Sequence, residues 1–329
     1  MPWTMQQMMD LATGYWRAAA LGAAVELGWF ERLTDQPLSA DELARAAGTA
    51  PRQTAALLRA LAGLGLLSEE RGRFAISSDA APFLRADSPT CLIEALRFNR
   101  DLYPVWGALA ESVRRGAPAV PPGAHLGGDP ARTRRFVLGM HSRATAMASA
   151  IAPAVVLPAR GPLLDVGSGP GTFSRRLAED RAGLRVIQFD LPPVLEVARE
   201  LTRGSSAADR IEFHSGDYRR DPLPPAGAIL FCGALHQETP ESAAALFRKM
   251  RGALPAGAPA TVIDLMVKPG GARPVFAALF SLNMMLFNPA AGVFEAGQTE
   301  ALLREAGFRD VASRSIPDLP YFAVTANAG

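Results

Sequence analysis

Residues 163–172 read Leu163-Leu164-Asp165-Val166-Gly167-Ser168-Gly169-Pro170-Gly171-Thr172, an apolar segment that ends in an acidic residue and continues in alternating glycines. This order is typical of a strand of a parallel sheet that turns directly into a helix. Because glycine has no Cβ, a turn with three glycines lets the backbone approach a ligand closely. The stretch therefore predicts a ligand-binding turn at the carboxyl edge of an α/β sheet.

Apolar strand-like segments alternate with helical ones from Gly161 to the end of the chain. Such alternation predicts a parallel sheet with helical crossovers, and we expect the last two strands to close it as an antiparallel pair. The predicted strands are Leu163–Val166, Arg185–Asp190, Ile211–His214, Ala228–Cys232, Ala260–Met266, Val311–Ser315 and Tyr321–Thr325. The fold class is α/β, a Rossmann-like sheet behind a mainly helical N-terminal domain.

The N-terminal part has the order of a winged helix. Ser39 and Glu42 form the Ser-x-x-Glu pattern of a capping box, which opens a helix that stops near Gly48. Pro51 suits the first turn of a second helix that runs to Leu64, and residues 68–76 suit a hairpin. A winged helix is common in DNA-binding proteins, but this second helix carries only two basic residues, Arg52 and Arg59. Packing and dimerisation are therefore favoured over DNA binding.

Helical spacing and composition complete the expected organisation. Ala-rich apolar spacing from Met5 to Leu33 predicts closely packed helices and a plausible dimer face. We expect a helical region over Leu92–Arg115, a loop over Gly116–Pro130 and a buried helix over Phe276–Phe287. The predicted domains are residues 1–98, for dimerisation, and 99–329, for the ligand-binding sheet.

Charge and cysteine content exclude several classes of protein. The 34 Lys and Arg residues and 32 Asp and Glu residues leave a net charge of +2, so nothing demands a nucleic-acid partner. Cys91 and Cys232 have neither the pairing nor the neighbours of a disulfide framework or zinc site. No signal peptide or membrane-spanning run is apparent, since a bilayer requires roughly 20 apolar residues. We expect a cytoplasmic protein without metal or membrane partner.

The glycine spacing favours S-adenosylmethionine (SAM) over a dinucleotide. A dinucleotide turn has the form Gly-x-Gly-x-x-Gly, whereas here Thr172 occupies the sixth position. Asp165 is expected to orient the turn or accept from the ammonium of SAM, and Asp190 to bind both ribose hydroxyls. Asp217, which follows the third strand, is a weaker candidate for the adenine amino group. A tight turn without any ligand is the alternative.

His236 is the best candidate for a general base. It follows the strand Ala228–Cys232 and should lie at the carboxyl edge of the sheet, where open α/β sheets bind ligands. A phenol is mostly protonated at neutral pH, so a neighbouring imidazole can accept its proton during methyl transfer. Asp264, at the end of the adjacent strand, can hold the imidazole in one tautomer. A structural histidine with a carboxylate partner is the alternative, and His141 is the reserve base.

Several apolar residues suit either an aromatic substrate pocket or the protein core. Both interpretations stay open, because apolar residues at helical spacing are usually core. The residues are Trp106, Phe136, Met140, Met284 and Met285.

Taken together, these motifs resemble the plant-type small-molecule O-methyltransferases and their bacterial relatives, which are class I SAM-dependent enzymes with an N-terminal winged-helix dimerisation domain. The similarity runs through residues 28–33 and 60–67, then through the motifs Asp165–Gly171, Asp190-Leu191-Pro192, Gly216-Asp217-Tyr218, Leu235-His236 and Ala306-Gly307-Phe308. The resemblance implies a SAM-dependent homodimer whose winged helix does not bind DNA.

The resemblance also implies roles for individual residues. His236 corresponds to the general base and Asp264 to its supporting acid, while Glu295 is the nearest match to a second acid. The implied SAM-binding residues are Asp165, Gly167, Gly169, Gly171, Asp190, Leu191, Asp217, Tyr218 and Cys232. The implied substrate-binding residues are Asn99, Trp106, Phe136, Met140, Arg143, Met285 and Asn288.

Two departures from the family pattern are present. The family usually has His-Asp-Trp, whereas this chain has His236-Gln237-Glu238, and Cys232 replaces a basic residue four positions before the histidine. The expected reaction is methyl transfer to a hydroxyl of a small aromatic or polyketide-like secondary metabolite. Methylation of carbon or nitrogen, a non-methylating reaction of a SAM-binding relative, and a winged-helix regulator that senses SAM remain alternatives.

Overall fold

The computed structural model describes residues 2–120 and 129–329, which form two compact units, Met1–Pro104 and Val105–Gly329. This division falls within the helix α7 (Ile93–Trp106), as does the expected boundary between residues 98 and 99. Part of the expected loop Gly116–Pro130, residues 121–128, lies outside the described residues.

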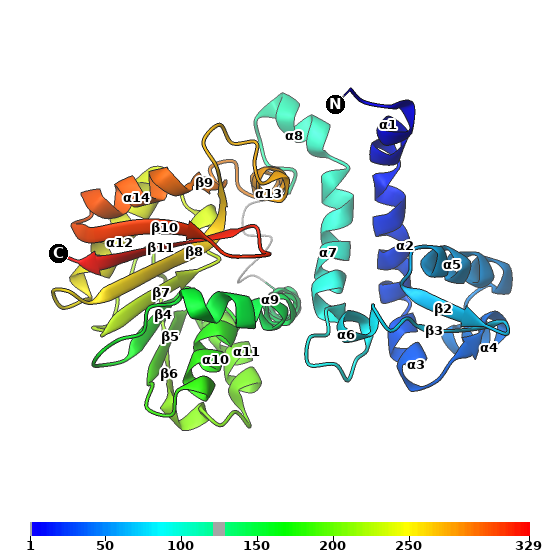
Figure 1. Cartoon of the computed structure of the whole chain (residues 1–329), viewed down its shortest axis with the longest axis horizontal. Coiled ribbons are helices and arrows are strands. Elements are labelled where there is room, and N and C mark those ends of the chain that lie inside the picture. Colours follow the sequence, from blue (N-terminus) through cyan, green and yellow to red (C-terminus); the bar gives the residue numbers. More distant parts are fainter. Residues whose placement is uncertain (1, 121–128) are drawn as a thin grey trace. The chain divides into compact units, whose positions relative to one another are not determined.

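The first unit contains the expected helix, turn, helix and hairpin (Figure 1). The capping box at Ser39 is formed in both directions, and Gly48 ends that helix in the left-handed conformation. The hairpin strands pair antiparallel, and a short strand not predicted from sequence adds a third, in the order β1-β3-β2. The elements are α1 (Met5–Ala12), α2 (Gly14–Glu26), α3 (Trp29–Asp35), β1 (Leu38–Ser39), α4 (Ala40–Ala47), α5 (Pro51–Gly63), β2 (Leu67–Glu70), β3 (Arg73–Ile76), α6 (Ala81–Leu84) and the start of α7.

The second unit is built on a twisted sheet with the strand order β10-β11-β8-β7-β4-β5-β6. All seven predicted strands are present, and the expected closing pair is antiparallel, with β11 inserted antiparallel beside β8. The other neighbours in this order pair in parallel, so their carboxyl ends share one edge. The strands are β4 (Leu163–Val166), β5 (Val186–Asp190), β6 (Ile211–Ser215), β7 (Ala228–Cys232), β8 (Pro259–Val267), β10 (Phe308–Ser315) and β11 (Tyr321–Ala328).

A short strand, β9 (Phe294–Glu295), pairs in parallel with the end of β8 and was not predicted. The helices of this unit are the end of α7, α8 (Leu109–Arg115), α9 (Pro130–Ile151), α10 (Thr172–Asp180), α11 (Pro192–Thr202), α12 (Pro240–Gly252), α13 (Val275–Met285) and α14 (Ala296–Glu305). Short 3-10 turns cover Ala152–Ala154, Ala208–Arg210 and Leu235–Gln237.

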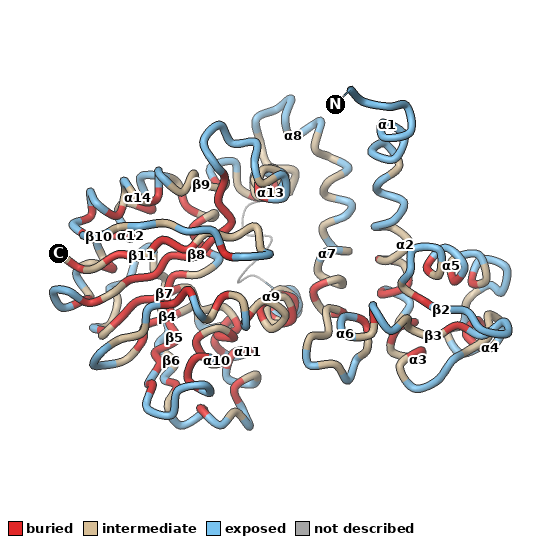
Figure 2. The backbone as a smooth tube through the Cα atoms, viewed as in Figure 1, coloured by how far each residue is buried: buried red, intermediate tan, exposed pale blue. Residues whose placement is uncertain are grey.

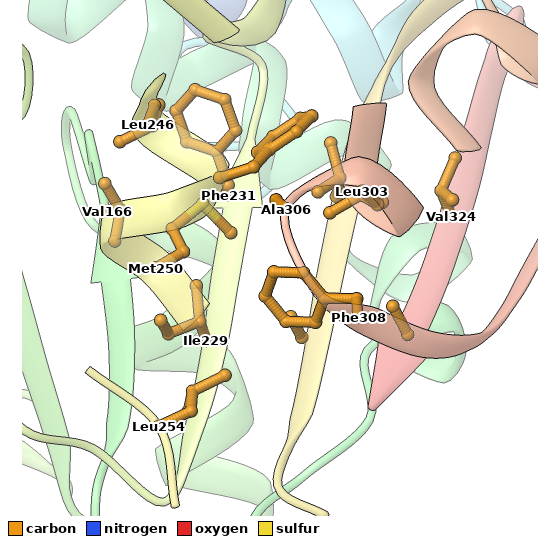
Figure 3. Packing of buried hydrophobic residues seen from close by; sticks show 14 of the residues in the cluster. Val166, Ile229, Phe231, Leu246, Met250, Leu254, Leu303, Ala306, Phe308 and Val324 are labelled. Carbon is orange, nitrogen blue, oxygen red and sulfur yellow. The ribbon is translucent and has the colours of Figure 1, made fainter. Parts of the chain in front are cut away.

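Two apolar layers hold this sheet in place. On one face, Phe231 and other strand residues pack against Phe247 of α12 and Leu303 of α14 (Figure 3). On the other face, Leu163 packs in a cluster with Ile151 of α9 and with α10. Each apolar side chain of this size that is buried stabilises the fold by about 1.5–3 kcal/mol relative to the same side chain in water. Figure 2 shows the strands β4, β5, β7 and β8 buried along most of their length, whereas β6 and β10 are largely exposed.

Two sequence-based expectations differ from the structure. The helical region Leu92–Arg115 is interrupted between α7 and α8, where Gly107 follows a helix that already contains Pro104. The helix over Phe276–Phe287 exists as α13, but the prediction that it is buried is wrong, because Ala277 is its buried residue and Phe276 is 57% exposed. Within the described ranges, no helix combines the length and apolar character needed to span a bilayer.

Candidate functional site

The glycine turn after β4 is shaped by three residues with positive φ. Gly167, Gly169 and Gly171 have φ angles of 63°, 55° and 64°, a region that other residues rarely adopt. A Cβ on Gly171 would lie 2.0 Å from Nε2 of the buried Gln188, whereas a Cβ on Gly169 would meet no atom within 4 Å. The turn is therefore closely packed behind Gly171 and open at Gly169.

Asp190, at the end of β5, holds this turn from the neighbouring strand. Its Oδ2 accepts a hydrogen bond from Gly169 N at 2.6 Å, and its Oδ1 accepts from Leu191 N at 2.7 Å. Burial raises the pKa of Asp190 to about 6, although the two backbone N–H groups oppose this change. The carboxylate predicted to bind ribose thus lies at the glycine turn, with Leu191 directly beside it.

Asp165 is buried at the end of β4 and faces the start of α10. Burial raises its pKa to about 7, which a hydrogen bond from Ser174 partly offsets and nearby Asp190 reinforces. The nearby Ser168, within the turn, has a buried hydroxyl without a hydrogen-bond partner among the described residues. A buried unsatisfied hydroxyl beside paired acidic residues fits a polar ligand such as the amino-acid end of SAM.

The loop after β6 reaches the same edge. Gly216 N donates to Asp190 O at 3.0 Å, and the Asp217 carboxylate accepts from Arg219 N at 2.9 Å while remaining partly exposed. The Tyr218 ring lies against Gly167, because a Cβ there would be 3.2 Å from Tyr218 Cε1. The predicted ribose and adenine residues are therefore brought together around the turn.

His236 and Asp264 form a close pair at the carboxyl edge. Asp264 Oδ1 lies 2.8 Å from His236 Nδ1, and Asp264 Oδ2 accepts from His236 N at 3.1 Å. The histidine side chain is 12% exposed and the aspartate 1%. Because a carboxylate accepts hydrogen bonds, this arrangement holds the ring proton on Nδ1 and leaves Nε2 as the basic nitrogen. Phe280 of α13 contacts the imidazole edge-on, with ring centroids 4.8 Å apart.

Cys232 is close enough to both groups of residues for their carboxylates to act on its thiol. It ends β7, and its thiol has a pKa raised well above the ordinary value by burial and by the nearby carboxylates of Asp165 and Asp264. The thiol therefore stays protonated and neutral near pH 7. It thus adds no charge near the carboxylates of Asp165 and Asp264.

The predicted substrate residues fall into separate environments. Phe136 and Met140 lie one turn apart on α9, and Phe136 packs in a cluster with Leu191. Burial lowers the pKa of Arg143, and the neighbouring Tyr321 opposes that effect. Trp106 Nε1 donates to Asn283 Oδ1 of α13 at 2.9 Å.

The other predicted residues are placed as follows. Met285 is 42% exposed at the end of α13, and Asn288 lines a cavity of about 220 Å³ together with Tyr218. Asn99 lies on α7 within the first unit. Glu295 Oε1 accepts from Gly270 N at 3.1 Å, so its described hydrogen bond leads to the loop after β8 and not to His236.

Three residues at this edge were missed from sequence. Phe280 contacts His236, Tyr321 lies beside Leu265 in the β11–β8 register, and Thr172 Oγ1 lies 2.7 Å from His141 Nδ1. Burial and the Arg175 charge lower the pKa of His141 to about 4, so this reserve base is neutral at pH 7. The antiparallel return of β11 was the available signal for Tyr321, since it places the start of that strand beside Asp264.

The described residues contain no group of three or more His, Cys, Asp or Glu side chains that could hold a metal ion. The site consists instead of a glycine turn, three acidic residues on successive strand ends and a histidine paired with a buried aspartate. This arrangement can bind a nucleoside-like cofactor and move a proton beside it.

Family models match both parts of the chain. Residues 106–309 match the O-methyltransferase domain, and residues 9–84 match the O-methyltransferase dimerisation domain.

Similar proteins cover almost the full length. Acetylserotonin O-methyltransferase of Mus musculus is 32% identical, over 98% of this chain and 88% of the relative. The 3-hydroxy-5-methyl-1-naphthoate 3-O-methyltransferase of Streptomyces sahachiroi is 31% identical, over 92% of this chain and 89% of the relative. The crystal structure of human N-acetylserotonin methyltransferase in complex with SAM superimposes with a TM-score of 0.91 at 25% identity, covering 100% of this chain and 99% of that chain.

Proposed function

This chain belongs to the O-methyltransferase family, and on that premise we propose that it transfers the methyl group of SAM to a hydroxyl of a small aromatic or polyketide-like metabolite, with His236 as general base. The observation that carries the proposal is the His236–Asp264 pair at the sheet edge that also holds the glycine turn. The cofactor of this family is SAM, and the acidic residues around the turn suit it.

Each proposed cofactor-binding residue is assigned to a different part of SAM. In this proposal, Asp190 accepts hydrogen bonds from the ribose hydroxyls, and Asp217 accepts from the adenine amino group. The open face at Gly169 and the unpartnered Ser168 hydroxyl suit the amino-acid end. When bound, SAM supplies an electrophilic methyl group. Leu191 and Tyr218 supply apolar surface. The neutral Cys232 thiol adds no positive charge that would repel the sulfonium of SAM.

His236 acts on the acceptor. Its Nε2 would take the proton of the acceptor hydroxyl as the methyl group passes from the sulfur of SAM to that oxygen, leaving S-adenosylhomocysteine, and Asp264 would stabilise the imidazolium that forms. Proton transfer of this kind contributes about 10²–10⁴-fold to rate, and holding the reactants in line contributes further. Glu295, which accepts a hydrogen bond from Gly270 N, is proposed as a second supporting acid.

The residues proposed for the acceptor pocket favour an aromatic acceptor. Phe136 and Met140 present apolar surface from α9, Phe280 adds an aromatic edge beside His236, and Arg143 offers a partly desolvated cation to a polar substituent. Trp106, Met285 and Asn288 are proposed as further pocket residues. The relative from Streptomyces sahachiroi, which is named for a hydroxynaphthoate substrate, supports a flat hydroxylated acceptor.

We also propose a homodimer formed through the first unit. This unit matches a dimerisation domain and exposes large apolar side chains on α1 and α2, including Trp16, which is 61% exposed. Isolated exposed apolar residues are common, but a contiguous set indicates an interaction surface. Light scattering behind a sizing column tests this: a mass twice 34.8 kDa supports the dimer, and a monomer at micromolar concentration refutes it.

The function is tested by incubating the purified protein with SAM labelled at the methyl group and a panel of phenolic, polyketide and heteroaromatic acceptors. Mass spectrometry of products and quantification of S-adenosylhomocysteine are read in parallel. A labelled methyl ether supports the proposal. A label on nitrogen or carbon assigns a different methyltransferase activity, and SAM binding without product from any acceptor supports a non-methylating reaction.

A further inference from the structure

Glu238 is a buried carboxylate two residues after His236, and both of its oxygens accept hydrogen bonds. The residue is 3% exposed. Its Oε1 accepts from the Tyr218 hydroxyl at 3.0 Å and from Arg219 Nε at 2.8 Å, and its Oε2 accepts from Ser242 Oγ at 2.6 Å. A second Arg219 nitrogen lies 2.7 Å from Oε1.

These contacts join three elements that the chain brings together only in the folded state. Tyr218 and Arg219 belong to the adenine-side loop after β6, Glu238 caps the 3-10 turn Leu235–Gln237 that carries His236, and Ser242 lies in the first turn of α12. Arg219 also donates to Gln237 O at 3.1 Å, so the loop binds the turn twice.

The arrangement extends to the cofactor turn and to the base. The Tyr218 ring contacts the face of Gly167, and it packs edge-on against Phe231 of β7 with ring centroids 5.7 Å apart. At the other end, the His236 ring and backbone N–H are held by Asp264. One buried carboxylate therefore stands between the residues proposed to bind adenosine and the residue proposed to remove the proton.

A charge at this position is poorly explained by stability alone. The Glu238 side chain is buried while that of its partner Arg219 is half-exposed, so the pairing offsets only part of the desolvation cost of the carboxylate and contributes geometry as much as energy. Fully hydrogen-bonded buried networks define a single arrangement of the segments they join. This chain also departs here from the His-Asp-Trp order of the family it resembles, because Glu238 occupies the third position.

We propose that Glu238 is a positioning residue that couples the adenine-side loop to the His236 turn, so that occupation of the cofactor site fixes the orientation of the base. The inference rests on the proposed function, because it assigns a consequence to SAM binding. Glu238 touches neither SAM nor acceptor in this account and acts only through Tyr218, Arg219 and the turn.

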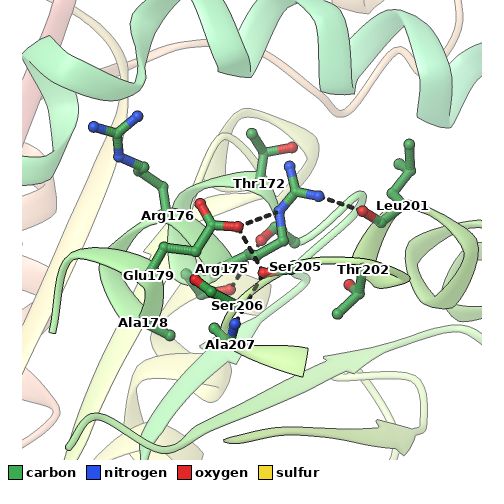
Figure 4. Close-up of polar contacts among 12 residues, drawn as sticks. Thr172, Arg175, Arg176, Ala178, Glu179, Leu201, Thr202, Ser205, Ser206 and Ala207 are labelled. Carbon is green, nitrogen blue, oxygen red and sulfur yellow. Dashed lines mark hydrogen bonds and ion pairs between the residues drawn. The ribbon is translucent and has the colours of Figure 1, made fainter. Parts of the chain in front are cut away.

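Glu238→Gln tests the coupling, because the amide keeps the shape of the side chain and removes its charge and half of its acceptor capacity. A matched control is Glu179→Gln on α10. Glu179 also accepts from a serine hydroxyl, Ser205 at 2.6 Å, and lies 3.9 Å from Arg175 (Figure 4). None of these three residues is proposed to bind SAM or the acceptor or to act as the base. The control therefore reports the general effect of neutralising a glutamate that accepts from a serine hydroxyl and lies near an arginine.

Two readouts separate positioning from structural support. The first is turnover at saturating SAM and acceptor; the second is the NMR shift of the His236 ring when S-adenosylhomocysteine is added. We expect Glu238→Gln to lower turnover about tenfold or more and to reduce the His236 response by at least half, while Glu179→Gln changes neither. A folded Glu238→Gln protein with both quantities at wild-type values overturns the proposal.

If Glu238→Gln does not fold, Tyr218→Phe removes one hydrogen bond from the network and leaves the carboxylate paired with Arg219 and Ser242. The same two changes are expected at smaller size, and their absence overturns the proposal equally. Should the wild-type protein methylate no acceptor, the proposed function fails, but the His236 response to S-adenosylhomocysteine and its dependence on Glu238 still decide whether the coupling exists.

Discussion

Replacing Asp264 with asparagine is expected to disable the base while leaving the cofactor site intact. In the wild-type protein, Asp264 Oδ1 holds the proton on His236 Nδ1, and the same carboxylate also accepts from the backbone N–H groups of His236 and Leu265. An asparagine has a single carbonyl oxygen, which at the Oδ2 position keeps the bond from His236 N but loses the bond that Leu265 N now makes to Oδ1. Its amide nitrogen would then face Nδ1 and donate to it, which places the ring proton on Nε2 and blocks the basic nitrogen.

The magnitude follows from the role of general base. Proton transfer by a positioned side chain contributes about 10²–10⁴-fold, so Asp264→Asn should lower turnover by at least about 100-fold, roughly 2.7 kcal/mol in activation free energy. Burial strengthens the effect, because the aspartate side chain is 1% exposed and water cannot replace it. SAM affinity should change less than about threefold, since Asp264 makes no contact with the glycine turn.

The assay measures S-adenosylhomocysteine release with the identified acceptor, together with SAM binding by calorimetry. Asp180→Asn is a suitable control, because Asp180 is a half-exposed carboxylate on α10 paired with Arg176. His236→Ala should match Asp264→Asn in turnover and retain SAM binding. Wild-type turnover in a folded Asp264→Asn or His236→Ala protein would refute the assignment of His236 as base.

Three further results are expected. Gly171→Ala should destabilise the fold by about 2–4 kcal/mol in denaturant unfolding, because its Cβ would lie 2.0 Å from Gln188 at a positive φ. Gly169→Ala should lower the free energy of unfolding by only about 1 kcal/mol but weaken SAM binding. Similar unfolding curves for the two variants would contradict this expectation. SAM affinity measured by calorimetry should fall as the pH drops below about 6, because burial raises the pKa of Asp190 to about 6 and only the ionised carboxylate accepts from both ribose hydroxyls. An affinity that stays constant between pH 5 and 7 argues against the ribose role of Asp190. Trp16→Glu should convert the dimer to monomer on a sizing column without loss of helical circular dichroism, and an unchanged mass places the interface elsewhere.

Much of the fold was readable from local pattern. The glycine turn, the seven predicted strands, the capping box at Ser39 and the hairpin depend on short-range rules of backbone conformation and periodicity, which the chain states residue by residue. The order of strand ends also placed Asp190, Asp217, His236 and Asp264 at one edge, because parallel strands share their carboxyl side. Individual strand bounds differed from the structure by a few residues.

Other features depended on contacts between distant segments. The short strands β1 and β9 have two residues each and exist only through their partners, so no local periodicity marks them. The apolar helix α13 was expected to be buried, because composition indicates helix and hydrophobicity but not which surface covers it. Whether Phe136 and Met140 serve the core or a pocket was likewise undecided by their spacing.

The amino-acid sequence by itself therefore determined the fold class, the glycine turn and the residues most suited to bind SAM and accept a proton. Tertiary structure decided which of those side chains meet: the 2.8 Å contact between His236 and Asp264, the direction of Glu295 toward Gly270, and the Glu238 network with Tyr218, Arg219 and Ser242. Strand and helix periodicity is a local property of the backbone, whereas the side-chain contacts of His236 with Asp264 and of Glu238 with Tyr218 and Arg219 join positions 19 to 28 apart and require the sheet to bring their elements together.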